Sequence, residues 1–426
     1  MINTLRNILR WKIATLARLT VRRFAPGIVG VTGSVGKTST KLAIGAVLGM
    51  SRRVRVAPGN LNNELGLPLA ILGNWSEKDI RRVSREGRGG IFSKGFFWCK
   101  VLILGFFRFL FLPKRAYPEI LVLEYGADKP GDLKELIAIA KPSVSVITAV
   151  GEVPVHVEFY ANQQEVAREK ARLIECLPSA GFAVLNFDDP TVMALKDRTR
   201  AHLTTFGFNK GAEVELARFE HRVVEGEPMG ISVKIVHSGS FVPVRIEGVF
   251  GKAHAYAAGA ATAVGLIFGM NLVSISEALK HYVPAPGRME LRRAVKEALL
   301  LDDSYNASPL SMRAALETLQ DLPAKRRIAV LGDMLEIGSY AMQAHEALGR
   351  PVSESVDILI TVGPRARFIA DGAVRAGMEK EKVFRFDEAE EAIDTVHDLL
   401  RKGDLVLVKG SHAMHLEQIV ESIKIR

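Results

Sequence analysis

The chain has 426 residues, of which 48% are hydrophobic and 24% are charged. This length predicts two or three domains, and the composition is typical of a globular protein rather than a disordered or fibrous one. The two cysteines, Cys99 and Cys176, are too few for a disulfide framework or a zinc site and fit a reducing compartment. The N-terminus shows no secretory signal peptide, so we expect a cytoplasmic location.

The net charge of +10 is concentrated in two segments. Residues 1–26 carry six basic residues and no acidic residue, and residues 76–118 carry ten basic and three acidic residues. The rest of the chain is therefore slightly acidic. Such localised charge argues against nucleic-acid binding and favours one local anionic partner.

The first predicted element is a basic amphipathic helix over residues 3–24, which ends before Pro26. The next segment, GIVGVTGSVGKTST at residues 27–40, has an apolar strand, a glycine-spaced turn and the start of a helix. This is the layout of a loop that binds phosphates with backbone N–H groups and a lysine, and Mg²⁺ with a Thr hydroxyl. Val31 stands where the strict motif has glycine, so a Gly-rich turn without a ligand is the alternative. The predicted nucleotide-binding residues are Gly33, Ser34, Val35, Gly36, Lys37, Thr38 and Ser39.

Residues 74–118 read as an insertion with a charged, Gly-rich first half and an intensely apolar second half. The apolar part, Phe96 to Leu112, is interrupted by Lys100 and Arg108 and is short for a transmembrane span. Two interpretations remain open. The segment is either a membrane-surface or re-entrant element, or a hydrophobic helix or hairpin that packs on this protein or a dimer partner.

From residue 119 onward, predicted strands alternate with helices, which indicates an α/β fold. Residues 204–250 have the alternating pattern of an antiparallel subdomain, and the Pro/Gly-rich segment 284–290 marks a domain boundary. We expect a basic N-terminal helix (1–26), a central P-loop ATPase-like domain with a mostly parallel sheet (27–284), and a C-terminal Rossmann-like doubly wound domain (285–426).

Three residues of the central segment are candidates for catalysis. Glu124 ends a buried strand and is expected to share a nucleotide-bound Mg²⁺ with Thr38, although a surface acid is the alternative. His156 follows another strand, where a metal ligand or catalytic group would lie. Composition alone predicts that Lys170, on a helix with mixed faces, is solvent-exposed.

Eight segments of the sequence resemble the Mur ligase family, whose members form peptide bonds in cell-wall precursors at the expense of ATP. They extend from residue 27 nearly to the C-terminus, and the DDSYNA and LGDM segments resemble MurF-type members, which join D-Ala-D-Ala to a muramoyl tripeptide. The matching segments are TGSVGKTST, NNELGLPL, LEYGADKPGDL, VHVE with AREKARL, PGRME, DDSYNASPLSMRAAL, RRIAVLGDMLEIG and VLVKGS.

The resemblance implies a role for each matched residue. Lys37 would neutralise the terminal phosphates of ATP, Arg288 would reach the γ-phosphate, and His254 and Asp303 would lie near the nucleotide. Of two Mg²⁺ ions, Thr38 and Glu124 would hold the first, and His156 and Lys170 the second. Lys170 falls on a lysine that is carbamylated in this family, which requires a lowered pKa. The substrate residues would be Asn62, Asn63, Glu64, Tyr305, Asn306, Lys409 and Ser411.

The sequence departs from the MurF-type pattern at three places. MurF-type members have a UDP-sugar-binding domain before the phosphate loop, whereas here the helix of about 26 residues precedes it. His254 is followed by Ala255 where the family has Asn, and the final KGSR reads KGSH with His412. We expect residues 1–24 and 91–115 to replace that domain, either at an anionic membrane surface or as a small packed unit.

Three functions remain open on the sequence alone. The first is ATP-dependent addition of D-Ala-D-Ala to a muramoyl tripeptide through an acyl phosphate. The second is a Mur-like ligase with a different amine or a lipid-linked substrate. The third is a non-catalytic nucleotide-binding scaffold, which the presence of the implied catalytic residues disfavours.

Overall fold

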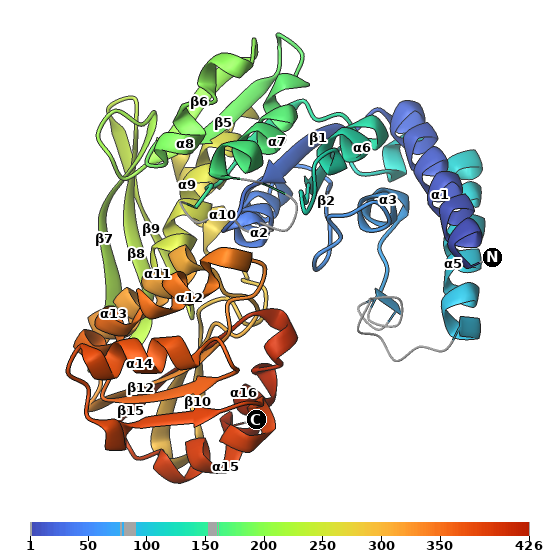
Figure 1. Cartoon of the computed structure of the whole chain (residues 1–426). Helices are drawn as coiled ribbons and strands as arrows, with labels where there is room; N and C mark the ends of the chain where they lie inside the picture. The colour runs from blue at the N-terminus through green and yellow to red at the C-terminus, as the bar shows by residue number, and fades with distance from the viewer. Residues whose placement is uncertain (1, 77–78, 81–90, 152–159, 161, 426) are drawn as a thin grey trace.

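The computed structural model describes residues 2–425 except 77–78, 81–90, 152–159 and 161. Two β-sheets organise these residues, one of nine strands and one of six (Figure 1). The α/β class and the mostly parallel sheets predicted from the sequence are confirmed.

The first sheet has the order β2-β3-β1-β4-β5-β6-β7-β8-β9. Its first six strands are parallel. The strands β1, β3, β4 and β5 are almost entirely buried, as their continuous apolar runs predict, whereas β2 is half-buried and β6 is buried only in its second half. The last three strands are antiparallel to one another but continue the same sheet, so residues 204–250 do not form a separate subdomain. The strands are β1 (Gly27–Thr32), β2 (Val54–Val56), β3 (Ile120–Glu124), β4 (Val144–Ile147), β5 (Phe182–Asn186), β6 (His202–Gly207), β7 (Val214–Val224), β8 (Glu227–His237) and β9 (Ser240–Glu247).

Helices cover both faces of the first sheet. On one face, the Ala-rich α9 packs against α2, and both contact a core of Val and Ile side chains from the strands. The other face carries α3, α6 and α7, and α1 packs outside α3 and α6. The helices are α1 (Ile2–Phe24), α2 (Lys37–Gly49), α3 (Gly66–Leu72), α5 (Ile91–Phe111), η1 (Lys114–Ala116), α6 (Asp132–Ile139), α7 (Gln163–Glu175), α8 (Pro190–Met193), η2 (Lys196–Arg198), α9 (Lys252–Ile267) and α10 (Leu272–Leu279).

The second sheet has the order β10-β11-β15-β12-β13-β14, and all strands except the edge strand β10 are parallel. Its elements are β10 (Glu290–Ala294), β11 (Ala298–Asp302), α11 (Pro309–Asp321), β12 (Arg326–Gly332), α12 (Ala341–Glu346), α13 (Gly349–Ser355), β13 (Ile358–Val362), α14 (Arg367–Arg375), β14 (Val383–Phe386), α15 (Ala389–Leu399), β15 (Asp404–Lys409) and α16 (Glu417–Ile423). Short 3₁₀ turns lie at Val295–Glu297, Gly338–Tyr340, Lys380–Lys382 and His412–Met414.

The predicted N-terminal helix and the apolar segment meet in the structure. The helices α1 and α5 lie side by side at one end of the first sheet (Figure 1). They run in the same direction, because Leu16 packs on Gly105 and, seven residues later, Arg23 lies over the ring of Phe109. We call this pair the α1–α5 arm. Among the described residues, no helix is both long and apolar enough to cross a membrane.

Candidate active site

The phosphate loop joins β1 to α2 at the carboxyl end of the first sheet. Gly33 and Gly36 have φ angles of +149° and +85°, which side-chain-bearing residues rarely adopt, and a Cβ on Gly33 would collide with Thr148. Thr148 follows β4 and donates a hydrogen bond to the carbonyl of Val35 at 2.6 Å. Neighbouring strands therefore fix the loop in the form that leaves its N–H groups at the start of α2, where phosphates bind.

Lys37 starts α2 and folds back over the loop. Its Nζ atom donates to the carbonyl oxygen of Gly33 at 2.8 Å. Burial lowers the pKa of Lys37, Glu124 opposes that shift, and Arg288 adds to it. Lys37 and Arg288 are thus close enough for electrostatic repulsion, although they are 251 residues apart in the sequence. Two cations brought together in this way favour a polyanionic ligand between them.

Glu124 ends β3 and is buried, so the alternative of a surface acid is wrong. Its carboxylate accepts hydrogen bonds from Thr38 at 3.2 Å, from Asn62 at 3.1 Å and from Lys41 at 3.0 Å. Burial by itself would raise the pKa of Glu124, but Lys41, Lys37 and the hydrogen bonds together lower it below its usual value. Glu124 is therefore an ionised carboxylate beside the Thr38 hydroxyl, as the predicted metal pair requires.

Lys41 is a functional candidate that the sequence interpretation missed. Its side chain is fully buried, and its Nζ atom bridges Glu124 and the carbonyl oxygen of Gly59 at 2.7 Å. The signal was present, because Lys41 lies three residues after Thr38 and so on the same face of α2.

Lys170 is buried, with 2% of its surface exposed, so the expectation of a solvent-exposed lysine is wrong. Its position on α7 lies within the stripe formed by Val166, Ala167 and Leu173, which packs toward the sheet. Burial, reinforced by the positive charge of Lys37, lowers the pKa of Lys170 to about 7. Near neutral pH a substantial fraction of this amine is therefore uncharged and nucleophilic.

Two acidic residues that were not predicted as site residues also act on this cluster. Asp128, in the loop after β3, raises the pKa of both Lys37 and Lys170. Glu336, in the loop after β12, raises the pKa of Lys37 and has a φ of +69°. The first lies at the end of the acidic segment LEYGAD, and the second lies in the LGDMLEIG segment, so both were within quoted motifs.

Arg288 lies between the two sheets and is held by aromatic and backbone contacts. Its guanidinium stacks on the ring of Tyr305 at 4.2 Å, and its buried Nε atom has no hydrogen-bond partner within the described chain. One ring nitrogen of His254 is hydrogen-bonded to the Arg288 carbonyl oxygen at 2.9 Å, and the other is hydrogen-bonded to the Tyr282 hydroxyl at 3.0 Å. Ser39, in the first turn of α2 after the phosphate loop, is close enough to the Tyr282 hydroxyl to oppose the rise in its pKa that burial causes. His254 thus connects the Arg288 segment to the start of α2 through Tyr282.

The second sheet presents its predicted residues at the carboxyl ends of β11 and β15. Lys409 is buried, and its Nζ atom donates to Asp303 at 2.6 Å and to the carbonyl oxygen of Asn306 at 2.9 Å. Asp303 also accepts from the backbone N–H of Met289 at 3.1 Å, next to Arg288. Tyr305 stacks on His412 with ring centroids 5.0 Å apart. These contacts join the DDSYNA, PGRME and KGSH segments into one cluster.

The remaining predicted residues have specific partners too. Ser411 accepts from the N–H of Leu335 at 2.8 Å and so fixes the loop that carries Glu336. Asn63 accepts from two N–H groups at the start of α3, including that of Gly66 at 2.9 Å. Glu64 faces Arg6 and Arg10 of α1 at 3.6 and 3.7 Å. His156 lies outside the described residues.

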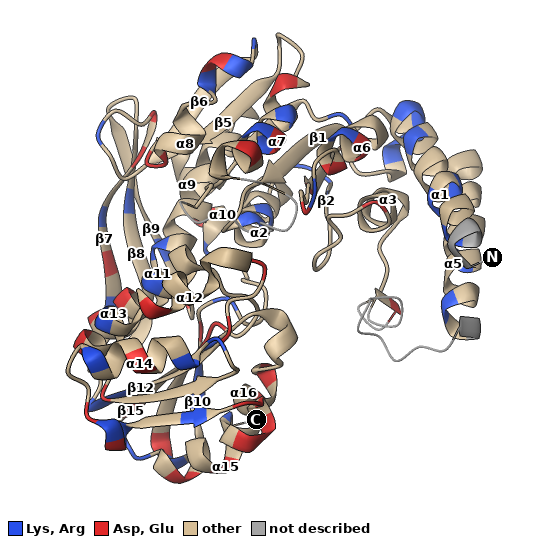
Figure 2. Cartoon of the chain, viewed as in Figure 1, with Lys and Arg blue, Asp and Glu red and all other residues tan. Residues whose placement is uncertain are grey.

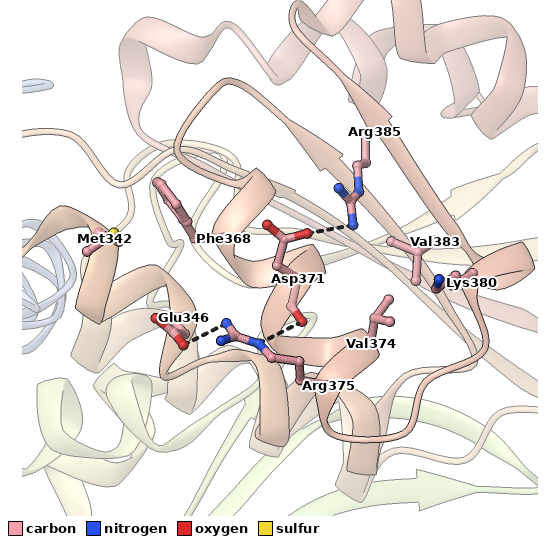
Figure 3. A pocket seen from close by; sticks show the side chains of 9 residues that line it. All are labelled: Met342, Glu346, Phe368, Asp371, Val374, Arg375, Lys380, Val383 and Arg385. Carbon is pink, nitrogen blue, oxygen red and sulfur yellow. Dashed lines mark hydrogen bonds and ion pairs between the residues drawn. The ribbon is translucent and has the colours of Figure 1, made fainter.

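A separate hollow of about 790 Å³ lies in the C-terminal part, where α12, α14 and β14 contribute its lining (Figure 3). Its charged side chains bind one another, with Arg375 on Glu346 at 2.6 Å and Arg385 on Asp371 at 2.8 Å. None of the predicted site residues lines it. The lining residues are Met342, Glu346, Phe368, Asp371, Val374, Arg375, Lys380, Val383 and Arg385.

Comparison with known proteins places this geometry in a family. Residues 104–265 match the Mur ligase middle domain, and residues 287–412 match the Mur ligase glutamate ligase domain. The UDP-N-acetylmuramoyl-tripeptide–D-alanyl-D-alanine ligase of Bacillus subtilis is 29% identical over 410 residues, which cover 96% of this chain and 78% of that protein. The ligase of the same name from Mycobacterium tuberculosis H37Rv is 29% identical over 442 residues, covering 96% and 76%.

Solved structures give the same result. The crystal structure of MurF ligase from Thermotoga maritima in complex with ADP has a TM-score of 0.77 and 28% identity, and the match covers 97% of this chain and 83% of that one. A folylpolyglutamate synthase from M. tuberculosis shares the fold, with a TM-score of 0.64 at 18% identity, over 96% and 95% of the two chains. The two family matches extend over most of residues 104–412 and contain Glu124, Lys170, Arg288 and Lys409. The chain therefore belongs to the Mur ligase family.

Proposed function

We propose that this Mur ligase couples ATP cleavage to amide-bond formation, adding D-Ala-D-Ala to a muramoyl tripeptide in peptidoglycan precursor synthesis. The observation that carries the proposal is the cluster around Lys37. A phosphate loop, the buried Glu124–Thr38 pair and Arg288 converge there from both sheets. The MurF ligases to which the chain is similar over 96% of its length are named for this reaction.

The chemistry follows from the charges of the site. A carboxylate oxygen of the acyl substrate attacks the γ-phosphorus of ATP, which releases ADP and gives an acyl phosphate. The amine then attacks the acyl carbon, the tetrahedral intermediate loses inorganic phosphate, and the amine proton passes to a base. Lys37 and Arg288 stabilise the negative charge of the phosphoryl group during the first step. The Arg288 Nε atom is buried and has no hydrogen-bond partner among the described residues, so it is available to donate to such an anion.

The residues present fit the Mg²⁺ ions expected in this reaction. Thr38 and ionised Glu124 would hold the first ion, which supplies charge neutralisation at the phosphates. Lys170 and His156 would contribute to the second. An amine with a pKa of about 7 reacts with carbon dioxide through its neutral form, so Lys170 is chemically suited to carry a carbamate. Burial favours the neutral amine that reacts, and the adjacent cationic Lys37 would stabilise the resulting anion.

The other predicted roles remain proposals. Gly33 to Ser39 would bind the phosphates, and Asp303 would lie near the nucleotide. His254 has both ring nitrogens engaged within the protein, so we assign it the positioning of Arg288 rather than direct contact with adenine. Substrate binding would involve Asn62, Asn63, Glu64, Tyr305, Asn306, Lys409 and Ser411. The domain limits 1–26, 27–284 and 285–426 and the cytoplasmic location are likewise proposed.

A second candidate is ligation on a lipid-linked muramoyl peptide at the inner membrane face, with the α1–α5 arm in place of a UDP-sugar-binding domain. The observation in its favour is the link between Glu64, in the proposed acyl-substrate loop, and Arg6 and Arg10 of α1. The arm and the proposed substrate loop are thus in direct contact.

The two candidates differ in the substrate that triggers phosphate release. Purified protein is supplied with ATP, Mg²⁺ and bicarbonate, and phosphate is measured with UDP-muramoyl-tripeptide, with D-Ala-D-Ala, with both, and with D-Ala-D-Ala plus a lipid-linked muramoyl tripeptide. Release that requires both supports the first candidate. If a lipid-linked muramoyl peptide must replace the nucleotide sugar, the second holds, and ATP binding without turnover on any of these combinations contradicts both.

A further inference from the structure

The α1–α5 arm has an outer face of exposed apolar side chains that the proposed reaction does not use. On α5, this face consists of side chains spaced three or four residues apart, so they form one stripe along the helix. Phe96 and Phe111 have 76% and 72% of their surface exposed, and Trp11 of α1 has 64%. The other large apolar residues exposed on the arm are Ile8, Leu19, Ile103, Leu104, Phe106, Phe107 and Leu110.

The opposite face of α5 is fixed to the protein. Phe97 and Val101 are buried in the core that includes α3 and β3, and Gly105 allows α5 to approach Leu16 of α1 closely. The Arg108 guanidinium donates to the carbonyl oxygen of Leu72 at 3.0 Å. One side of α5 is thus packed against protein while the other faces outward, which is the arrangement of a helix that lies in a membrane surface rather than across it.

The charges of the arm have one sign. Across α1, α5 and η1 there are eleven basic residues and no acidic residue. Figure 2 shows blue segments along α1 and α5. Lys12, Arg22, Lys114 and Arg115 are exposed, and none is within ion-pair distance of an acidic side chain among the described residues. Basic side chains beside an apolar stripe match the negative headgroups and acyl chains of an anionic bilayer.

We propose that the outer face of the α1–α5 arm docks the protein on an anionic lipid bilayer, with the two helices lying in the plane of the headgroups. A second copy of this chain is a poor occupant, because two faces with these charges would repel each other. The proposal concerns a surface separate from the cleft. It is therefore independent of the first candidate reaction, whereas the second candidate, ligation on a lipid-linked substrate, also requires it.

Flotation with vesicles of equimolar phosphatidylcholine and phosphatidylglycerol tests the proposal, with pure phosphatidylcholine vesicles for comparison. We expect the wild-type protein to float with the anionic vesicles at low salt. Binding to the neutral vesicles should be at least about tenfold weaker, and binding to the anionic ones should fall as NaCl is added. Failure to bind anionic vesicles at low salt would overturn the proposal.

Two sets of exposed substitutions locate the contact. Phe106→Ser with Phe107→Ser and Phe111→Ser removes apolar side chains, and Lys12→Glu with Arg22→Glu reverses charges. Each set should weaken vesicle binding about tenfold or more, while the affinity for ATP and the midpoint of thermal unfolding stay at the wild-type values. Unchanged vesicle binding in both sets would contradict the assigned face.

Matched control variants distinguish docking through the arm from non-specific hydrophobic adsorption to vesicles. Phe241 and Val273 are 61% and 65% exposed on β9 and α10, away from the arm, and Phe241→Ser with Val273→Ser should leave vesicle binding within about twofold of wild type. The molar mass in solution is measured for all variants. A dimer that the Phe106, Phe107 and Phe111 substitutions convert to monomers, without vesicle binding by the wild type, would assign the face to a second copy and overturn the proposal.

Discussion

The cleft and the α1–α5 arm use charge in opposite ways. In the cleft, Lys41, Lys170 and Lys409 are buried and Lys37 is half-buried. Lys41 and Lys409 are paired with carboxylates, and Lys37 and Lys170 have lowered pKa values. On the arm, Lys12, Arg22, Lys114 and Arg115 are exposed and stand near exposed apolar side chains, with no acid on the same helices. The first arrangement prepares a site for a small polyanion, and the second suits an extended anionic surface. Substitutions in one region should therefore leave the function of the other intact.

The largest difference between the effect on the cleft and the effect on the arm is expected for Lys37→Ala. The substitution removes the cation that would stabilise the phosphoryl group, and phosphate release should fall on the order of 10³-fold. Binding to anionic vesicles should not change, because Lys37 is remote from the arm. Lys37→Arg is the matched control, since it retains the charge with different geometry. If Lys37→Ala lost vesicle binding as strongly as it loses phosphate release, the cleft and the arm would not be independent.

Lys170 gives a pH-dependent test of the cleft. The neutral amine fraction rises as the pH increases through about 7, so carbamylation and turnover should rise over the same range in the presence of bicarbonate. Lys170→Arg keeps the positive charge but has no amine to carboxylate, and we expect a loss of about 100-fold. A carbamate signal in ¹³C NMR with labelled bicarbonate, absent in this variant, checks the assignment. Turnover independent of bicarbonate would contradict it.

The next prediction concerns how much the buried ion pair of Lys41 and Glu124 contributes to the free energy of unfolding. Lys41→Met leaves the Glu124 carboxylate buried without its ion-pair partner, and the free energy of unfolding should fall by about 3 kcal/mol. Adding Glu124→Gln removes the orphaned charge and should restore part of that loss. Chemical denaturation of the wild type, both single variants and the double variant measures the coupling. Additive losses would mean that the two side chains do not stabilise each other.

Arg288→Lys probes the segment that joins the two sheets. Lysine keeps the charge but cannot stack as a planar group on Tyr305, so kcat/KM for ATP should fall about tenfold.

The smallest effect is expected for Phe111→Ser on the arm. Its side chain is 72% exposed, so unfolding free energy should stay within about 0.5 kcal/mol and turnover should be unchanged. A large loss of stability would show that Phe111 is covered in solution.

The two regions also differ in how far the sequence predicts them. Continuous apolar runs identify β1, β3 and β4, and the glycine spacing identifies the phosphate loop, because both signals are local. The burial of Lys170 and Lys41 depends on which helix faces pack on the sheet, although each lies on a face that its neighbours mark as internal. Glu336 approaches Lys37 only through the packing of the second sheet. The parallel pairing of α1 with α5, 89 residues apart in register, has no local signal either.

The most direct test of the proposed ligation follows the oxygen of the acyl substrate. The muramoyl tripeptide is labelled with ¹⁸O in the carboxylate that accepts D-Ala-D-Ala, and the phosphate released during turnover is analysed by mass spectrometry. An acyl phosphate intermediate transfers one ¹⁸O atom to each phosphate, because the carboxylate oxygen bonds to phosphorus and leaves with it. We predict that transfer. Phosphate released without ¹⁸O while the amide product forms would contradict activation of the carboxylate at the Lys37 cluster.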